Sequence, residues 1–235
     1  MKNSETNFGY KKIREEEKVK KVKEVFNSVA TNYDLMNNLM SFGLHKVWKK
    51  FLIETANLKS GAKILDIAAG TADLTLAFAK QKKDFKIFHT DINFSMLREG
   101  NKKLTNQGII LPSILCDAEN LPFPNNYFDC VTIGFGLRNM THKEKALTEI
   151  YRVLNPGGKI IILEFSKIWR PLSKLYDFFS FNIVPKLGKI ISNDEASYQY
   201  LVESIRVHPN QEELKKTMIN KGFEKVSYLN LNSGI

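Results

Sequence analysis

The sequence contains little cysteine and no long apolar run. Two of its 235 residues are cysteine, and neither lies in a C-x-x-C pair or in a Cys/His spacing that suits zinc. We therefore expect no disulfide framework, no metal site and a reducing compartment. No run of about 18 apolar residues occurs, and the polar N-terminal residues 1–12 lead into no apolar segment. These absences predict a soluble or peripheral protein of the cytoplasm.

Acidic residues are also in the minority. Lys and Arg number 35 against 25 Asp and Glu, which gives a formal net charge of +10. Such an excess favours an anionic partner, either nucleic acid or an acidic membrane surface, although an ordinary basic surface has the same composition. Charge alone does not distinguish these alternatives.

Hydrophobic periodicity predicts an α/β protein. Two N-terminal stretches, 11–29 and 44–56, have apolar residues at helical spacing. Strand-like runs then alternate with helical ones, with strands expected at 63–67, 86–91, 112–115, 128–133 and 158–165, and helices at 73–80, 94–105 and 143–154. This alternation predicts a Rossmann-like fold, a mostly parallel twisted sheet with helices on both faces.

The ends of the chain are expected to add helices to this core. Residues 1–58 should form an N-terminal helical cap, and 59–235 the core. Within the core, the aromatic-rich stretch 169–207 should form helices inserted before the last strand. A helix at 211–220 and that last strand at 223–230 would close the chain.

Residues 64–74 are typical of a turn that binds a nucleoside. A short strand containing Asp66 ends in small residues around Gly70 and Thr71 and leads into a helix, so a ligand can approach free backbone N–H groups. Asp91 ends the next strand, where its carboxylate can accept both ribose hydroxyls. The glycine triplet that makes room for a pyrophosphate is absent, so the turn better suits a ligand without phosphates, such as S-adenosylmethionine.

A third element follows the third expected strand. Asp117 and Ala118 lie there, and the Asp117 carboxylate could accept a hydrogen bond from the exocyclic amine of an adenine. The alternative is an ordinary loop aspartate.

Several segments resemble the ubiquinone/menaquinone biosynthesis C-methyltransferases, a family of class I S-adenosylmethionine-dependent methyltransferases. The matching segments are 26–37, 39–49, Phe135–Asn139 (Phe-Gly-Leu-Arg-Asn), 151–158, 163–166 and 203–209. The resemblance spans nearly the whole chain, and its Gly-Leu-Arg-Asn and Glu-Ser-Ile-Arg segments are far more specific than the shared cofactor motif.

The resemblance implies a cofactor and an acceptor. The acceptor would be a polyprenylated hydroquinone, either demethylmenaquinol or 2-methoxy-6-polyprenyl-1,4-benzoquinol, methylated on a ring carbon. Thr71, Asp91 and the pair Asp117-Ala118 match the family's cofactor-binding residues, and Gly134 stands where many relatives have a serine that touches the cofactor. Relatives also continue past residues 233–234 with a further antiparallel strand, so we expect the last strand of this chain to be loosely held.

The resemblance also suggests residues for the chemistry. Arg138 and Asn139 follow the fourth strand, where Arg138 could stabilise a phenolate; a salt bridge to a helix acid is the alternative. Tyr33 could bind the substrate oxygen or relay a proton, or simply pack. His45 is a further candidate base, although a histidine near a helix start is more often a satisfied polar residue.

The sequence leaves other functions open. An S-adenosylmethionine-dependent methyltransferase could act on another small molecule or on nucleic acid, but the sequence has no Asn-Pro-Pro-Tyr site and no Pro-Cys motif, so we expect no nucleic-acid partner. The aromatic stretch 169–184 could hold the isoprenoid tail. The basic arm 11–23 could rest on anionic lipid at the inner face of the membrane, near other quinone-biosynthesis enzymes. Tail length, the choice of quinol and the oligomeric state are not determined by the sequence.

Overall fold

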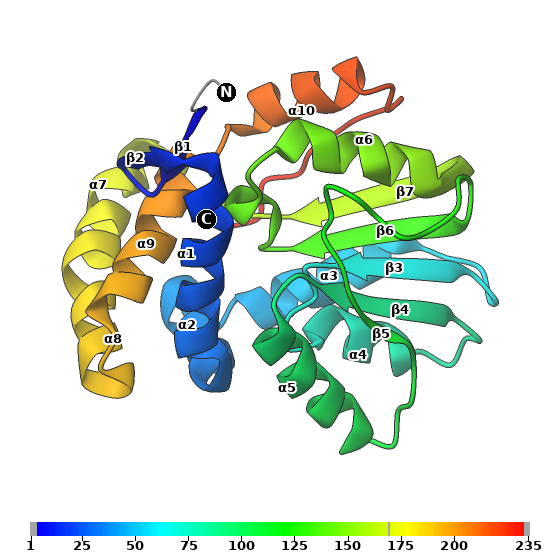
Figure 1. Cartoon of the computed structure of the whole chain (residues 1–235), viewed down its shortest axis with the longest axis horizontal. Helices are drawn as coiled ribbons and strands as arrows, with labels where there is room; N and C mark the ends of the chain where they lie inside the picture. Colours follow the sequence, from blue (N-terminus) through cyan, green and yellow to red (C-terminus); the bar gives the residue numbers. More distant parts are fainter. Residues whose placement is uncertain (1–3, 169, 233–235) are drawn as a thin grey trace. The chain divides into compact units, whose positions relative to one another are not determined.

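The computed structural model describes residues 4–168 and 170–232. These residues form two compact units (Figure 1): the first contains 4–45, 165–168, 170–220 and 224–232, and the second contains 46–164 and 221–223. Trp169, which belongs to the proposed tail-binding stretch, lies outside the described residues.

The second unit is built on a five-stranded parallel sheet. Its strands run in the order β5-β4-β3-β6-β7, and every neighbouring pair is parallel. The strand bounds are β3 Lys63–Ile67, β4 Lys86–Asp91, β5 Ser113–Leu115, β6 Phe128–Gly134 and β7 Leu154–Leu163. The order reverses at β3, so β3, β4 and β6 end side by side at the edge where open α/β sheets bind ligands.

Both faces of this sheet are covered. The helices are α3 His45–Ala56, α4 Asp73–Ala79, α5 Phe94–Thr105 and α6 Lys143–Val153. On one face, Leu52 of α3 and Phe78 of α4 pack in one cluster with Ile64 of β3. Leu65 and Val131 point to the opposite face because side chains alternate along a strand, and both are fully buried. The predicted Rossmann-like sheet is therefore confirmed.

The first unit is mainly helical. Its elements are β1 Glu5–Phe8, β2 Lys11–Arg14, α1 Glu15–Val29, the 3₁₀ turn η1 Ala30–Asn32, α2 Tyr33–Ser41, α7 Arg170–Phe178, the π-helical turn η3 Phe179–Ile183, α8 Val184–Ser192, α9 Glu195–Val207 and α10 Gln211–Asn220. Ser28 of α1 and Ser197 of α9 share a hydrogen bond of 3.0 Å between their hydroxyls. Helices α7, α8 and α9 fall within the aromatic-rich stretch 169–207, so the helices expected there are present.

Two predicted elements are wrong. Residues Lys11–Arg14 do not begin the first helix but pair with Glu5–Phe8 in an antiparallel hairpin, because Gly9 takes a φ of +58° that permits a tight turn. Residues 223–230 form no strand. There Lys225 has a φ of +51°, which breaks an extended backbone, and most side chains of this segment are exposed, so burial does not favour a sheet.

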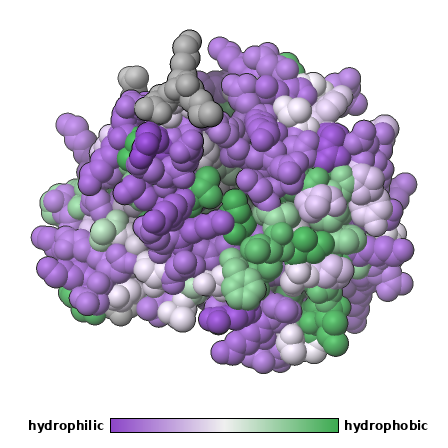
Figure 2. Space-filling model, in the orientation of Figure 1, coloured by the Kyte–Doolittle hydropathy of each residue, from purple (hydrophilic) through white to green (hydrophobic). Residues whose placement is uncertain are grey.

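The surface is largely polar. Figure 2 shows hydrophilic residues over most of the visible face, with apolar residues gathered into smaller areas. Among the described helices, none has the length and apolar character needed to cross a membrane.

Candidate cofactor and methyl-transfer site

The turn after β3 has an unusual backbone. Ala68, Gly70 and Ala72 have φ angles of +50°, +54° and +65°, so three of five successive residues lie in the left-handed region. This conformation is favourable for glycine and costs about 1 kcal/mol or more for alanine. The turn therefore stores strain where it was predicted to meet a ligand.

Asp91 anchors the turn from the end of β4. Its Oδ2 accepts the Gly70 N–H at 2.9 Å, and its Oδ1 accepts the Asn93 N–H at 2.8 Å. Burial raises the pKa of Asp91 to about 6, although these backbone hydrogen bonds oppose the shift. Each carboxylate oxygen has two lone pairs, so both can still accept a ribose hydroxyl.

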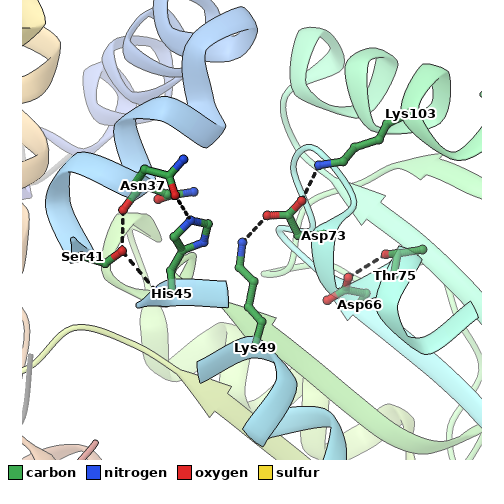
Figure 3. Close-up of polar contacts among 9 residues, drawn as sticks. Asn37, Ser41, His45, Lys49, Asp66, Asp73, Thr75 and Lys103 are labelled. Carbon is green, nitrogen blue, oxygen red and sulfur yellow. Dashed lines mark hydrogen bonds and ion pairs between the residues drawn. The ribbon is translucent and has the colours of Figure 1, made fainter. Parts of the chain in front are cut away.

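Asp66 is fully buried beneath the turn. Its two carboxylate oxygens accept the hydroxyls of Thr75 at 2.7 Å and Thr132 at 2.8 Å (Figure 3 shows the Thr75 bond). Burial raises its pKa to about 6 against these hydrogen bonds. Asp66 therefore joins β3, α4 and β6, which holds the start of α4 in place behind the turn.

His89 and Gly100 also shape the turn, and the sequence analysis missed both. The ring Nε2 of His89 lies 3.1 Å from the Gly70 carbonyl oxygen, and burial lowers the pKa of this histidine. A Cβ atom on Gly100 would lie 2.5 Å from the same carbonyl oxygen. A glycine inside the expected helix 94–105 was the available signal, since glycine there often marks a close approach.

Asp117 and Ala118 lie next to Asp91. The Cys116 N–H donates to the main-chain oxygen of Asp91 at 3.1 Å, so the loop after β5 begins beside the end of β4. The Asp117 Oδ1 accepts the Glu119 N–H at 2.8 Å, which forms a local turn and leaves Asp117 half-buried. Ala118 and Thr71 are buried, with 8% and 7% of their surfaces exposed.

Arg138 forms a buried ion pair. Its side chain is 0% exposed, and that of Glu164, which follows β7, is 5% exposed. Arg138 Nη1 donates to Glu164 Oε1 at 2.7 Å and to the Phe135 carbonyl at 2.5 Å, while its main-chain N–H donates to Glu164 Oε2 at 3.1 Å. Arg138 thus forms a salt bridge, but its partner follows strand β7 and is not the helix acid of the alternative prediction. Glu164 had no role in the sequence analysis, because nothing local indicates its partner.

Gly134 and Asn139 flank the same loop. A Cβ on Gly134 would lie 2.9 Å from Leu74 Cδ1, so a larger residue would displace the start of α4 or that side chain. The Asn139 amide donates to the Phe135 carbonyl at 3.4 Å and is half-buried. Asn139 is therefore partly exposed, whereas the neighbouring Arg138 side chain has no exposed surface.

The second unit brings most of the predicted site together. Asp66, Gly70, Thr71, Asp91, Asp117, Ala118, Gly134, Arg138 and Asn139 all lie at or just beyond the carboxyl ends of its strands. Tyr33 belongs to the first unit, at the start of α2, where it is buried and its ring centroid lies 6.2 Å from that of Phe26.

His45 also belongs to the first unit. It is 1% exposed, and its Nε2 lies 3.0 Å from the Asn38 side-chain oxygen. Ser41 accepts the main-chain N–H of His45 and donates to the Asn37 carbonyl (Figure 3). His45 is therefore buried and hydrogen-bonded, and its role as a base stays a prediction.

This strand order, the strained turn and the carboxylate that ends β4 define a Rossmann-like methyltransferase. Solved structures of such enzymes have the same fold. A possible histamine N-methyltransferase from Thermotoga maritima matches with a TM-score of 0.57 at 20% identity, covering 86% of this chain and 81% of that one. A putative methyltransferase from Bacillus halodurans matches with a TM-score of 0.56 at 20% identity, covering 75% and 68%.

Sequence comparison identifies the family. Residues 12–235 match the ubiE/COQ5 methyltransferase family. The chain is 57% identical over 233 residues to proteins named ubiquinone/menaquinone biosynthesis C-methyltransferase UbiE from Burkholderia mallei and Burkholderia thailandensis, covering 99% of this chain and 96% of theirs. The chain belongs to the ubiE/COQ5 methyltransferase family, which confirms the resemblance, and S-adenosylmethionine is its methyl donor.

Proposed function

We propose that the chain transfers a methyl group from S-adenosylmethionine to a ring carbon of a polyprenylated hydroquinone, either demethylmenaquinol or 2-methoxy-6-polyprenyl-1,4-benzoquinol. The observation that carries this proposal is the 57% identity, over 99% of the chain, to relatives named for quinone biosynthesis. An electron-rich phenol has nucleophilic ring carbons beside its oxygen, and more so as the phenolate. The enzyme has to align such a carbon with the donor methyl, exclude water and remove a proton.

The residues of the second unit fit the cofactor. We propose that Asp91 accepts the ribose hydroxyls, that Asp117 and Ala118 meet the adenine, and that Gly70, Thr71 and Gly134 offer backbone and small side chains to the remainder. Asp66 would act by holding the turn. Asp91 supports this role because both of its oxygens are fixed by backbone N–H groups and can accept further hydrogen bonds. The bound cofactor supplies an electrophilic methyl group on sulfur.

We propose that Arg138 and Asn139 act on the acceptor oxygen as one assembly. The Glu164 carboxylate and the Phe135 carbonyl fix the guanidinium, so its field needs no reorganisation during the reaction. Asn139 shares the Phe135 carbonyl and is the half-buried member, so its amide is the group that can orient a ring oxygen. Tyr33 remains a proposed proton-handling residue, which a Tyr33→Phe variant tests through its effect on turnover.

We also propose a peripheral membrane role. The acceptor carries an isoprenoid tail, for which the segment 170–184 offers aromatic and apolar residues, among them the exposed Leu175 and Phe178. The residues 11–23 carry seven Lys and Arg against three Glu, so attraction to anionic lipid should be weak and depend on salt. Cosedimentation with anionic vesicles at low and high salt tests this, and equal binding to neutral vesicles would contradict it.

The proposed reaction is tested with labelled S-adenosylmethionine. The purified chain should transfer label to the two demethylated quinols and not to duplex DNA, tRNA or simple phenols without a tail. Label in nucleic acid alone would replace this proposal with the alternative function. Unequal rates on the two quinols would identify the preferred acceptor.

A further inference from the structure

A group of three charged residues lies beside the turn and has no role in the function described so far. Lys49 of α3 and Lys103 of α5 both form ion pairs with Asp73, the first residue of α4 (Figure 3). Lys49 donates to Asp73 Oδ2, and Lys103 donates to Oδ1 at 2.5 Å. One carboxylate thus serves two ammonium groups, and the group carries a net positive charge.

Lys49 is the more buried of the two cations. Its side chain is 10% exposed, against 30% for Lys103 and 20% for Asp73. Burial would raise the pKa of Asp73, but the two lysines outweigh it and hold this pKa at about 2. Asp73 therefore stays ionised at neutral pH and balances one of the two positive charges.

The Lys49 ammonium has unused hydrogen-bonding capacity. An ammonium has three N–H donors, and Asp73 is the one hydrogen-bond acceptor that the described part of the chain gives it. Two further neighbours are the ring of Phe135, whose centroid lies 5.8 Å from Nζ, and the buried Asp66 carboxylate, with which Lys49 interacts through charge. A buried cation with free donors beside a ligand-binding turn is costly unless a ligand supplies an acceptor.

The position of Lys49 indicates which part of the cofactor that ligand group belongs to. Asp73 directly follows the turn after β3, and Phe135 directly follows β6. Asp91 ends β4 and Asp117 follows β5, and these two strands lie on the other side of β3 in the sheet. If Asp91 and Asp117 hold the adenosine at β4 and β5, the amino-acid end of S-adenosylmethionine would lie toward the ends of β3 and β6.

We infer that Lys49 binds the α-carboxylate of the methionine part of S-adenosylmethionine, with Asp73 positioning its ammonium group. The carboxylate supplies the negative charge that the group lacks and takes up the free N–H donors, in a charge-assisted hydrogen bond. Lys49 is then a cofactor-binding residue and Asp73 its positioning residue, whereas Lys103 is an additional partner of Asp73 that the binding does not require. This inference rests on the cofactor assignment and not on the identity of the quinol.

Calorimetry with two ligands tests the inference. S-adenosylhomocysteine carries the carboxylate, whereas 5′-methylthioadenosine has the same adenosine and thioether without the amino acid. Lys49→Met should weaken S-adenosylhomocysteine binding about 10- to 100-fold, the scale of one charge-assisted hydrogen bond, and change 5′-methylthioadenosine binding less than about threefold. Lys103→Met is the matched control, which should change neither affinity by more than about threefold because Lys49 and Asp73 remain paired.

Each other outcome would overturn the inference. An equal loss of both ligands in Lys49→Met would make Lys49 a structural residue, and an equal loss of S-adenosylhomocysteine in Lys103→Met would show that net charge matters and not the position of Lys49. If Lys49→Met does not fold, Lys49→Gln keeps a polar side chain and should show the same selective loss. Failure of the unaltered chain to bind either ligand would instead refute the cofactor assignment.

Discussion

Removing Arg138 should cost both stability and turnover, and the structure sets the size of the first effect. Arg138 and Glu164 are almost wholly buried, so Arg138→Met removes the ion-pair partner of the Glu164 carboxylate, with Lys143 acting on it only through charge. Breaking a buried pair on one side costs about 3–5 kcal/mol. In a protein of 235 residues each kcal/mol lowers the melting temperature by about 2–4 °C, so we expect a fall of roughly 6–20 °C.

The double variant separates the structural role from the chemical one. Arg138→Met with Glu164→Leu removes both charges, so most of the stability should return, because well-packed apolar residues often replace a buried ion pair without loss. Turnover should not return. If the fixed guanidinium stabilises the developing phenolate, kcat should stay about 10²–10³-fold low in both variants, with S-adenosylhomocysteine affinity close to that of the unaltered chain.

Urea unfolding, thermal melting and steady-state kinetics on the three variants provide the measurements. A single Arg138→Met variant that melts like the unaltered chain would refute the energetic reasoning from burial. A double variant with normal turnover would show that Arg138 acts on structure alone, and Tyr33 would then be the leading residue for handling the proton.

Three further predictions concern the turn. Asp91→Ala should remove two charge-assisted hydrogen bonds of about 1.5–3 kcal/mol each, and unchanged S-adenosylhomocysteine affinity would rule out its ribose role. Burial raises the pKa of Asp91 to about 6 in the ligand-free fold, so the folded state favours the protonated carboxyl. The contribution of Asp91 to folding stability is therefore complete below its unfolded pKa and is lost as pH rises through 6. Ribose hydroxyls donate to the ionised form of Asp91, so the affinity for S-adenosylhomocysteine should rise about tenfold from pH 5 to 7, and binding should release a proton. Calorimetry in two buffers measures both effects. An affinity that does not change with pH would contradict this prediction. Ala72→Gly should stabilise the fold by up to about 1 kcal/mol because glycine adopts a φ of +65° without strain, whereas the control Ala77→Gly inside α4 should destabilise it by a similar amount. Equal effects of the two variants in thermal melts would count against strain in the turn.

Local patterns predicted the sheet well. The strands at 63–67 and 86–91 and the helix at 94–105 have the predicted bounds, because strand runs and helical stripes alternate clearly there. The strand ends in turn located Gly70 and Asp91, since residues that follow parallel strands meet at one edge. This part of the site depends on chain order, which a sequence shows directly.

Other parts depend on contacts between distant residues. The pairing of Arg138 with Glu164, of His89 with the Gly70 carbonyl and of Lys49 with Asp73 joins residues from separate elements, and none has a local signature. The hairpin at Glu5–Phe8 and Lys11–Arg14 was missed for a different reason. Its charged residues continue the pattern of the helix that follows, so periodicity did not distinguish a strand from a first helical turn.

The proposed reaction forms a carbon–carbon bond on a quinol ring. The most direct measurement uses S-adenosylmethionine with a ¹³C methyl group and a demethylated quinol that carries deuterium at the ring position to be methylated. Carbon methylation replaces the ring deuterium, so the product should contain an aryl ¹³C-methyl group and no deuterium at that position, as read by mass spectrometry and NMR. A product that keeps the deuterium and carries the ¹³C-methyl on oxygen would contradict carbon methylation, as would a quinol recovered without any ¹³C.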